Sequence, residues 1–427
     1  MLSPVLANEP PIRSLRGKRV LVLVQGELAQ SPRMLNHARA LCEEGAEVTL
    51  AGYAELPLPE DIAHAPRLSV RRISEAGAER LDSVPRIFYL PVAAARAARA
   101  SMRLAWLLSA VTGTFDVAIV QNPPALPALP LALLSARARG ARIIVDWHSR
   151  TAAMLGLRLG RGHAVVRLVN RLEGWLARRA SDHFAVSNAM RDDLRERFGI
   201  DAAVLHDRPR LKHATLNAEQ RIAVVRRVLN ARRVASAPDD AFVLVSPTSF
   251  SADEDMDMLL DALGLVARRS PATPIMLFAT GFGPLRPRFE ARARKIGTAK
   301  LRIVTGWLPE QLYRDLLRAA DLGVSMHRSA SGVDLPMKVV DMVEAGLPAA
   351  VFDYGPCLSE LVRPELKPFM FTDAEGLAAR LGELLHGPRL ANLHAQMAGE
   401  SGPLWSEEWR RVAMPLIAGD ARQAVND

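Results

Sequence analysis

The sequence has few cysteines and no long apolar run. With only Cys42 and Cys357 among 427 residues, neither a disulfide scaffold nor a cysteine metal site is expected. No apolar run reaches the roughly 18 residues that span a bilayer, and residues 1–18 lack a signal-peptide pattern. These absences argue against a secreted or integral membrane protein, and a reducing, cytoplasmic location is expected.

Lysines and aromatic residues are also scarce. The chain has 49 arginines but six lysines, and a net charge of +9. This balance favours anionic partners such as nucleotides, phosphates and anionic lipid. Aromatic residues make up 5% of the chain, which argues against nucleic acid because single-strand grooves interleave basic and aromatic side chains. Each lysine therefore marks a position where a compact, flexible ammonium has been kept.

Length and periodicity predict an α/β fold with two domains, since 427 residues exceed one ordinary core. Short apolar runs alternate with helical patterns in both halves, which is typical of doubly wound parallel sheets. We expect two Rossmann-like domains that face a central cleft. Strands are expected at 19–24, 47–52, 115–121, 141–148, 183–187 and 202–207, and then at 241–250, 274–281, 301–307, 321–327, 347–353 and 368–373.

Composition places the boundaries between these domains. The first domain is expected over residues 1–210, a polar and Arg-rich helical linker over 211–239, the second domain over 240–400, and a terminal segment over 401–427. Ligands bind at the carboxyl ends of the strands in such sheets, so the cleft between the domains is the expected active site.

One lysine lies in "SGVDLPMKVVDMVEAG", residues 331–346. Pro336 suits a first helical turn, so a helix is predicted to begin near Met337, after a turn at Gly332. The free amides and dipole at that end form an anion site, and Lys338 adds a full charge. Asp341, one turn farther on, shares the face of Lys338 and can accept hydrogen bonds from sugar hydroxyls. A diphosphate beside a ribose would satisfy both groups. The alternative is a capped surface helix with an ion pair between the two side chains.

The segment "QGELAQSPRM", residues 25–34, links the first strand to the first helix. Ser31 is expected as the N-cap, before a proline at the first helical position. Gly26 would let a ligand approach the backbone closely, although the G-x-G-x-x-G fingerprint of dinucleotide sites is missing. Glu27 and Arg33 are expected near the cleft, with a cap or loop role as the alternative for Glu27.

The tripeptide "DWH", residues 146–148, ends a predicted strand. Because side chains alternate along a strand, Asp146 and His148 share one face and Trp147 takes the other. An acid and an imidazole at a cleft edge are candidates for proton abstraction. Histidine titrates near neutral pH, and Asp146 either acts directly or orients it. The alternative is a histidine satisfied by the backbone at a strand end.

Two further segments have structural interpretations. "DEDMD", residues 253–257, contains two D-x-D patterns, but it follows Thr248 and Ser249 at a helix start, where acids complement the dipole and need no metal. "TGFGPLR", residues 280–286, contains Gly281 and Gly283 with a proline directly after, which by itself indicates a turn. No metal site is therefore predicted.

Residues 84–111 combine apolar residues with Arg86, Arg96, Arg99 and Arg103. A basic amphipathic helix of this kind can lie in a membrane interface, so an anionic membrane surface is an expected partner. The alternative is a core helix with a solvated arginine edge.

Taken together, these segments resemble the β-1,4-mannosyltransferases that add the first mannose to the lipid-linked chitobiose precursor of N-glycans, a family of GT-B glycosyltransferases. The resemblance runs from about Arg19 to Leu385. It rests on the joint order and spacing of "SPRM" with His37, "QNPP" at 121, "DWH" at 146, "NAMRDDL" at 188, "DEDMDMLLDAL" at 253, "GFGPLR" at 281, "ADLGVSMH" at 320 and "SGVDLPMKVVDM" at 331.

The resemblance implies a GDP-mannose donor on the C-terminal domain and a polyprenyl-diphosphate-linked saccharide acceptor on the N-terminal domain. It also implies inversion at the anomeric carbon without a metal ion or other cofactor. Charge on the departing GDP must then be met by protein groups, a role suited to Lys338 and the adjoining helix end. Asp341 takes the place of the ribose-binding acid, and residues 305–308 would flank the guanine.

These roles give two sets of candidate residues. Inversion by single displacement needs a base, for which Asp146 and His148 are the candidates, with Glu27 in reserve. The candidate donor-binding residues are Gly26, Arg33, Thr248, Ser249, Gly281, Gly283, Trp307, Leu308, His327, Ser331, Gly332, Asp334, Leu335, Pro336, Met337, Lys338 and Asp341. In the terminal segment, Trp405 and Trp409 are expected to anchor a helix that crosses back to the first domain.

Two features depart from the family pattern. The N-terminal membrane anchor of the eukaryotic members is not seen in this sequence, and residues 210–238 look unlike theirs. One alternative is thus a peripheral enzyme at the cytoplasmic face of a membrane that acts on an undecaprenyl-diphosphate saccharide. Others are a GT-B enzyme with a different nucleotide sugar, and a non-catalytic basic Rossmann protein that binds nucleotides or nucleic acid.

Overall fold

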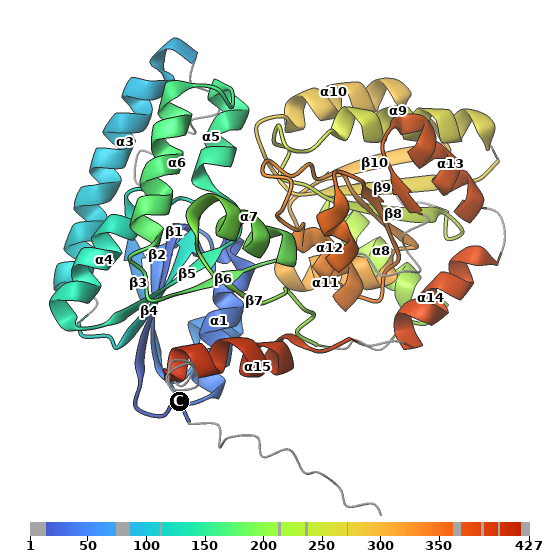
Figure 1. Cartoon of the computed structure of the whole chain (residues 1–427). Helices are drawn as coiled ribbons and strands as arrows, with labels where there is room; N and C mark the ends of the chain where they lie inside the picture. The colour runs from blue at the N-terminus through green and yellow to red at the C-terminus, as the bar shows by residue number, and fades with distance from the viewer. Residues whose placement is uncertain are drawn as a thin grey trace, which may run out of the picture.

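Two parallel β-sheets, each covered by helices, lie side by side (Figure 1). The computed structural model describes residues 14–73, 86–111, 113–211, 215–234, 238–270, 272–361, 369–385, 388–399 and 402–419. The first sheet has the strand order β3-β2-β1-β4-β5-β6-β7 and the second has the order β10-β9-β8-β11-β12-β13. All pairings between these strands are parallel. The predicted α/β fold with two doubly wound sheets is confirmed.

The strands are short, as expected of parallel sheets. Their bounds are β1 Arg19–Glu27, β2 Glu47–Tyr53, β3 Leu68–Ile73, β4 Val117–Asn122, β5 Arg142–Trp147, β6 Asp182–Ala185, β7 Ala203–Val204, β8 Phe242–Pro247, β9 Ile275–Thr280, β10 Leu301–Gly306, β11 Leu322–Ser325, β12 Ala349–Phe352 and β13 Met370–Phe371. The sequence pattern did not predict β3. This edge strand keeps two arginines in solvent and lacks the continuous apolar run of the central strands.

Helices follow almost every strand. Their bounds are α1 Pro32–Glu43, α2 Glu60–Ala63, α3 Arg86–Trp106, α4 Ala128–Arg139, α5 Thr151–Leu159, α6 Ala164–Ala177, α7 Asn188–Phe198, α8 Ala218–Ala231, α9 Met256–Arg269, α10 Arg286–Ile296, α11 Glu310–Ala319, α12 Met337–Glu344, α13 Ala374–Leu385, α14 Arg389–Gly399 and α15 Trp405–Ala418. Short 3-10 turns occupy η1 Leu28–Gln30 and η4 Pro356–Glu360, and a π-helical turn, η3 Leu107–Val111, ends α3.

Burial on both sheet faces explains the apolar runs in the central strands. One face of the first sheet packs against α1 and α15, and the other packs against α3, α4, α6 and α7. Val22 at the middle of β1 pairs with Leu50 of β2 and Ile119 of β4, so β1 lies in the sheet interior. The second sheet has one continuous core around β8 and β9.

The segment predicted as a linker contains α8, which is part of the second domain's core. Val228 and Leu229 of α8 are buried there, and Arg221 donates to the carbonyl of Ala319. At the other end of the chain, α15 returns to the first domain and lies beside α1 (Figure 1). The domain boundaries at 210, 239 and 400 stay a prediction, but α8 is packed rather than free.

Direct contacts join the two domains at the carboxyl edge of the first sheet. The Ser187 hydroxyl donates to the carbonyl of Val333 at 2.7 Å. The Glu360 carboxylate accepts from the amides of Asn188 and Ala189, which begin α7, and lies 3.0 Å from His206 Nε2. The loop before α12 therefore lies against the end of β6, next to β5.

Helix α3 has one face in the core and one in solvent. Leu104 is buried with the turn that follows it, whereas Met102 and Trp106 are more than 60% exposed. The side chains of residues 86–90 lie outside the described structure, as do residues 84 and 85. Within the described residues, none of the helices combines the length and apolar content needed to cross a bilayer.

Candidate active site

Helix α12 begins at Met337, as predicted, and its amino end carries no capping side chain. Pro336 occupies the N-cap position and offers no side-chain acceptor, so the first-turn amides are left for an anion. Lys338 lies in that first turn, and burial lowers the pKa of its ammonium to about 8. Gly332 adopts φ 78°, the turn that the sequence predicts before the helix.

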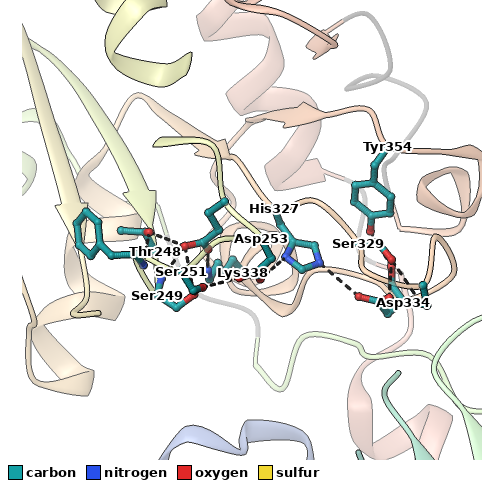
Figure 2. Close-up of polar contacts among 12 residues, drawn as sticks. Thr248, Ser249, Ser251, Asp253, His327, Ser329, Asp334, Lys338 and Tyr354 are labelled. Atoms are coloured by element: carbon teal, nitrogen blue, oxygen red, sulfur yellow. Dashed lines mark hydrogen bonds and ion pairs between the residues drawn. The ribbon is translucent and has the colours of Figure 1, made fainter. Parts of the chain in front are cut away.

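Glu254 holds the Lys338 ammonium (Figure 2). The other oxygen of the Glu254 carboxylate accepts from the Thr248 hydroxyl at 2.6 Å and from the Ser249 amide at 2.8 Å. Glu254 is buried, and the sequence reasoning did not single it out. The alternative ion pair between Lys338 and Asp341 is contradicted, because Lys338 turns to Glu254.

Asp341 is positioned by a tyrosine instead. The Tyr313 hydroxyl donates to Asp341 Oδ2 at 3.0 Å, and burial raises the pKa of the Asp341 carboxyl to about 6. Among the described residues, no partner is recorded for Oδ1 of Asp341. A carboxylate with one free oxygen, one turn beyond Lys338, suits a sugar hydroxyl.

His327 provides a second cation beside Lys338. Its Nδ1 lies 3.4 Å from Asp253 Oδ2 and its Nε2 lies 3.3 Å from Asp334 Oδ2 (Figure 2). Burial opposes protonation, yet the two carboxylates raise the pKa of His327 to about 9, so the ring is charged at neutral pH. An antiparallel bridge between His327 and Glu254 holds the two cation-bearing loops together.

Asp334 anchors the loop that precedes α12. Its Oδ1 accepts from the hydroxyls of Ser329 and Ser331, and its carbonyl accepts from Tyr354 at 2.7 Å. Burial would raise the pKa of Asp334, but the hydrogen bonds from His327 and the serines lower it. Asp334 and Ser331 thus hold this loop, and their polar atoms already have partners within it.

The two glycines of "TGFGPLR" are required by close packing. A Cβ on Gly281 would lie 1.8 Å from the carbonyl oxygen of Thr248, and one on Gly283 would lie 1.7 Å from that of Ser249. The loop after β9 therefore presses on the loop after β8. Of the acids in "DEDMD", Asp255 accepts from the Met258 amide, which confirms helix capping at this position.

In the first domain, Asp146 at the end of β5 is enclosed by donors. Arg33 binds it through Nε at 2.8 Å and Nη2 at 2.9 Å, and His37 and His148 approach Oδ2 at 3.2 and 2.9 Å. Burial would raise the pKa of Asp146, but Arg33 and His148 hold it well below its usual range. A fully buried, acceptor-saturated carboxylate cannot reach a substrate hydroxyl, so direct action by Asp146 is contradicted.

The same geometry contradicts Arg33 as a donor-binding residue. Its guanidinium is 2% exposed and binds Asp146, Asp207 Oδ1 and the carbonyl of Leu205. Although burial opposes its charge, these two carboxylates raise the pKa of Arg33 above its ordinary value. Every strong donor of Arg33 is used inside the domain, so none is left for a ligand.

His148 is the member of this cluster that reaches the cleft. Its side chain is 24% exposed, and the ionised Asp146 requires His148 Nε2 to carry the proton. The Nδ1 lone pair, for which no described partner is recorded, is then the basic atom. The structure therefore favours an imidazole oriented by Asp146 over a carboxylate acting directly.

Glu27 has the loop role that was the alternative for it. Its carboxylate accepts from the amides of Ala29, Glu55 and Leu56 at 3.4, 2.9 and 3.4 Å. Three backbone donors leave little basicity for proton transfer, so Glu27 as a reserve base is contradicted. The Ser31 hydroxyl donates to the carbonyl of Glu27, and Ser31 makes no side-chain cap bond to α1.

The remaining candidates lie in different surroundings. Trp307 is about half exposed after β10, but Leu308 is buried in the second core, which contradicts a side-chain contact between Leu308 and a base. A Cβ on Gly26 would meet only Val24 Cγ1 at 3.7 Å, so packing does not demand glycine there. Leu335 and Met337 are half-buried beside the buried Pro336.

These observations fit comparisons with known proteins. Residues 29–210 match the family described as Glycosyl transferase 4-like domain. The structure of WaaG, a glycosyltransferase involved in lipopolysaccharide biosynthesis, shares this fold with a TM-score of 0.62 at 14% identity, covering 94% of this chain and 100% of that chain. Two facing doubly wound domains with a cation-bearing helix end in one and an acid–imidazole pair in the other define a GT-B glycosyltransferase.

The sequence relatives are more specific. The chain is 32% identical to the chitobiosyldiphosphodolichol beta-mannosyltransferase of Yarrowia lipolytica, over 96% of this chain and 89% of that protein. It is 30% identical to the human protein of the same name, over 95% of this chain and 94% of that protein. The chain belongs to this family of beta-mannosyltransferases, as the sequence motifs predict.

Proposed function

We propose that the protein transfers mannose from GDP-mannose, with inversion, to chitobiose linked to a polyprenyl diphosphate, forming a β-mannoside. The observation that carries this proposal is the open amino end of α12 with Lys338, in a loop region that touches the domain bearing His148. The names of the relatives, which specify a beta-mannosyltransferase of chitobiosyl diphosphodolichol, support the acceptor class.

The donor binds to the second domain. The α12 amides, Lys338 and the charged His327 stabilise the diphosphate, and Asp341 accepts a ribose hydroxyl through its free oxygen. In the ligand-free protein Lys338 rests on Glu254. A diphosphate carries more negative charge than that single carboxylate, so it can draw Lys338 toward itself without leaving Glu254 unpaired, because Thr248 and Ser249 still donate to it.

The base is His148. Its Nδ1 takes the proton of the acceptor hydroxyl while the hydroxyl oxygen forms a bond to the anomeric carbon and the bond from that carbon to the GDP oxygen breaks. Asp146 stays ionised, holds the Nε2 proton and stabilises the imidazolium that forms. The electron pair of the broken bond ends on GDP, where Lys338 and His327 meet it.

The acceptor implies a membrane, and we include peripheral association with its cytoplasmic face in the proposal. No metal is assigned to any step, so EDTA is expected to leave the rate unchanged. The test is incubation with GDP-mannose and a short-chain polyprenyl-diphosphate chitobiose, followed by mannosidase digestion of the product. A β-linked trisaccharide supports the proposal. Transfer from a UDP-sugar but not from GDP-mannose, or an α-linked product, would contradict it.

A further inference from the structure

Large apolar side chains are exposed on two neighbouring helices of the first domain. Met154 and Leu157 of α5, and Leu168, Leu172 and Trp175 of α6, are each between 37% and 56% exposed. The two helices pack against each other as a hairpin beside the interdomain region (Figure 1). We call these five side chains the hairpin surface. A contiguous apolar patch of this kind marks an interaction site.

The spacing in α6 puts its three apolar side chains on one outward face. Leu168, Leu172 and Trp175 follow an i, i+4, i+7 pattern, while Val166 and Leu176 point inward and are buried. Arg171 and Arg178 are exposed next to this stripe, and the guanidinium of Arg179 lies 3.4 Å from the centre of the Trp175 ring. The face is amphipathic, with an apolar centre and a basic rim.

The charge of the hairpin has one sign. Residues 151–180 contain six arginines and one acid, Glu173. Glu173 is fully buried and accepts from Asn122 and from the amides of Thr151 and Ala152, so it fixes the start of α5 and neutralises nothing at the surface. Within the part of the chain that the structure describes, Arg171 and Arg178 form no ion pair.

A cavity of about 480 Å³ opens beside the stripe. Arg171, Arg178 and Arg197 line it together with the apolar walls of Leu172, Trp175 and Phe198. Arg197 is already paired with Asp193, whereas Arg178 spends one N–H on the carbonyl of Phe198. Guanidinium groups above an apolar wall are suited to a phosphate headgroup with its glycerol and upper acyl carbons below.

We propose that the hairpin surface docks the protein onto an anionic lipid bilayer, with Leu168, Leu172 and Trp175 in the interface and Arg171 and Arg178 on phosphate headgroups. This inference rests on the proposed function, because a lipid-linked acceptor places the substrate at a membrane. The basic rim selects a bilayer over a protein partner of unknown charge: amphipathic helices with arginines beside leucine and tryptophan lie in anionic interfaces. Since α5 begins three residues after His148, docking here also brings the bilayer next to the base.

The test is flotation of the purified full-length protein with vesicles of phosphatidylcholine, with and without 30% phosphatidylglycerol. The wild-type protein is expected to float with anionic vesicles and to be released by high salt. Each arginine near such a surface contributes about fivefold, so Arg171→Gln with Arg178→Gln is expected to weaken binding roughly 25-fold. Leu168→Ser with Leu172→Ser is expected to weaken it by about tenfold.

The matched control is Arg294→Gln with Lys295→Gln, which removes the same charge from an exposed turn of α10. It is expected to float like the wild type, and all variants should share its thermal midpoint. Equal binding losses for control and hairpin variants, or no vesicle binding by the wild type, would overturn the inference. So would dimerisation of the wild type without lipid that the leucine changes abolish, since the occupant would then be a second copy.

Transfer to a water-soluble short-chain acceptor separates the two proposals. Retained transfer without vesicle binding leaves the proposed function and removes the docking surface. Vesicle binding that depends on Arg171 and Arg178, without transfer to any such acceptor, keeps the surface and removes the proposed function.

Discussion

The indole N–H of Trp409 donates to Nδ1 of His37 at 3.0 Å, although the two residues are 372 positions apart in the chain. This bond fixes the tautomer of His37, because a ring nitrogen that accepts must leave the proton on the other nitrogen. His37 Nε2 then donates to Asp146, which orients His148. Burial lowers the pKa of His37, consistent with a neutral ring. The last helix therefore supports the proposed base of the first domain.

Trp409→Phe keeps the ring but removes this donor. A buried acceptor is left unpaired, so the free energy of unfolding should fall by about 1–3 kcal/mol. With Asp146 less firmly held, kcat should fall by roughly tenfold, the lower end of the effect seen when outer partners of functional imidazoles are removed. The affinity for GDP, measured by calorimetry, should not change.

Trp405→Phe is the matched control for that variant. Trp405 is also buried in α15, but its indole N–H donates to the carbonyl of Asn36 rather than to His37. A similar loss of stability with an unchanged kcat is expected. If both variants lose kcat equally, α15 acts through general packing and the role given to Trp409 is wrong.

His148→Ala should lower kcat by about 10²- to 10⁴-fold, because it removes the group that takes the acceptor proton. Asp146→Asn should also lower kcat, since the amide cannot accept from Arg33, His37 and His148 together. GDP binding should persist in His148→Ala. Single-turnover rates measure the effect, and a His148→Ala enzyme with more than half of the normal rate would exclude this histidine as the base.

Glu27→Gln tests the loop role of that residue. The amide oxygen can still accept from one or two of the three backbone amides, so stability should fall by about 0.5–2 kcal/mol. The kcat of the folded enzyme should stay within about twofold of the wild type. A fall of a hundredfold or more, with unchanged donor affinity, would return Glu27 to the list of bases.

Binding of GDP-mannose without acceptor should depend on pH at both ends. The pKa of Asp341 is raised to about 6, so its carboxylate and the bond to ribose are lost as the pH falls through 6. The pKa of Lys338 is lowered to about 8 and that of His327 is raised to about 9, so the cations are lost as the pH rises through 8 and 9. Affinity should be highest between about pH 6 and 8.

GDP-mannose is the right probe because its diphosphate diester does not titrate in this range. Asp341→Asn should remove the acid limb of the affinity profile, and Lys338→Arg should shift the alkaline limb upward. Affinity that is constant from pH 5 to 10 in the wild type would show that neither group touches the donor.

Local pattern was sufficient for most of the fold. Continuous apolar runs at β1, β8 and β9, and the proline before α12, led to correct strands and a correct helix start. It failed at β3, whose exposed arginines hide the apolar alternation, and it took the packed helix α8 for a linker because its outward face is polar.

The site was less accessible because its contacts join distant residues. Nothing in "DEDMD" says that Glu254 will meet an ammonium 84 positions away. Arg33 read as a free cation, and only the fold brings Asp146 and Asp207 onto it. His37 left a usable signal, since it shares the inward face of α1 with Met34 and Leu41, where an imidazole must find partners.

Calorimetric titration of Lys338→Gln with GDP and with guanosine tests the central claim most directly, with Lys295→Gln as the control. Loss of a charged contact to the diphosphate is worth about 1.5–3 kcal/mol. The account therefore expects GDP affinity to fall by roughly 10- to 150-fold while guanosine affinity stays the same. Unchanged GDP affinity in Lys338→Gln, or equal losses for GDP and guanosine, would contradict the assignment of the diphosphate to the amino end of α12.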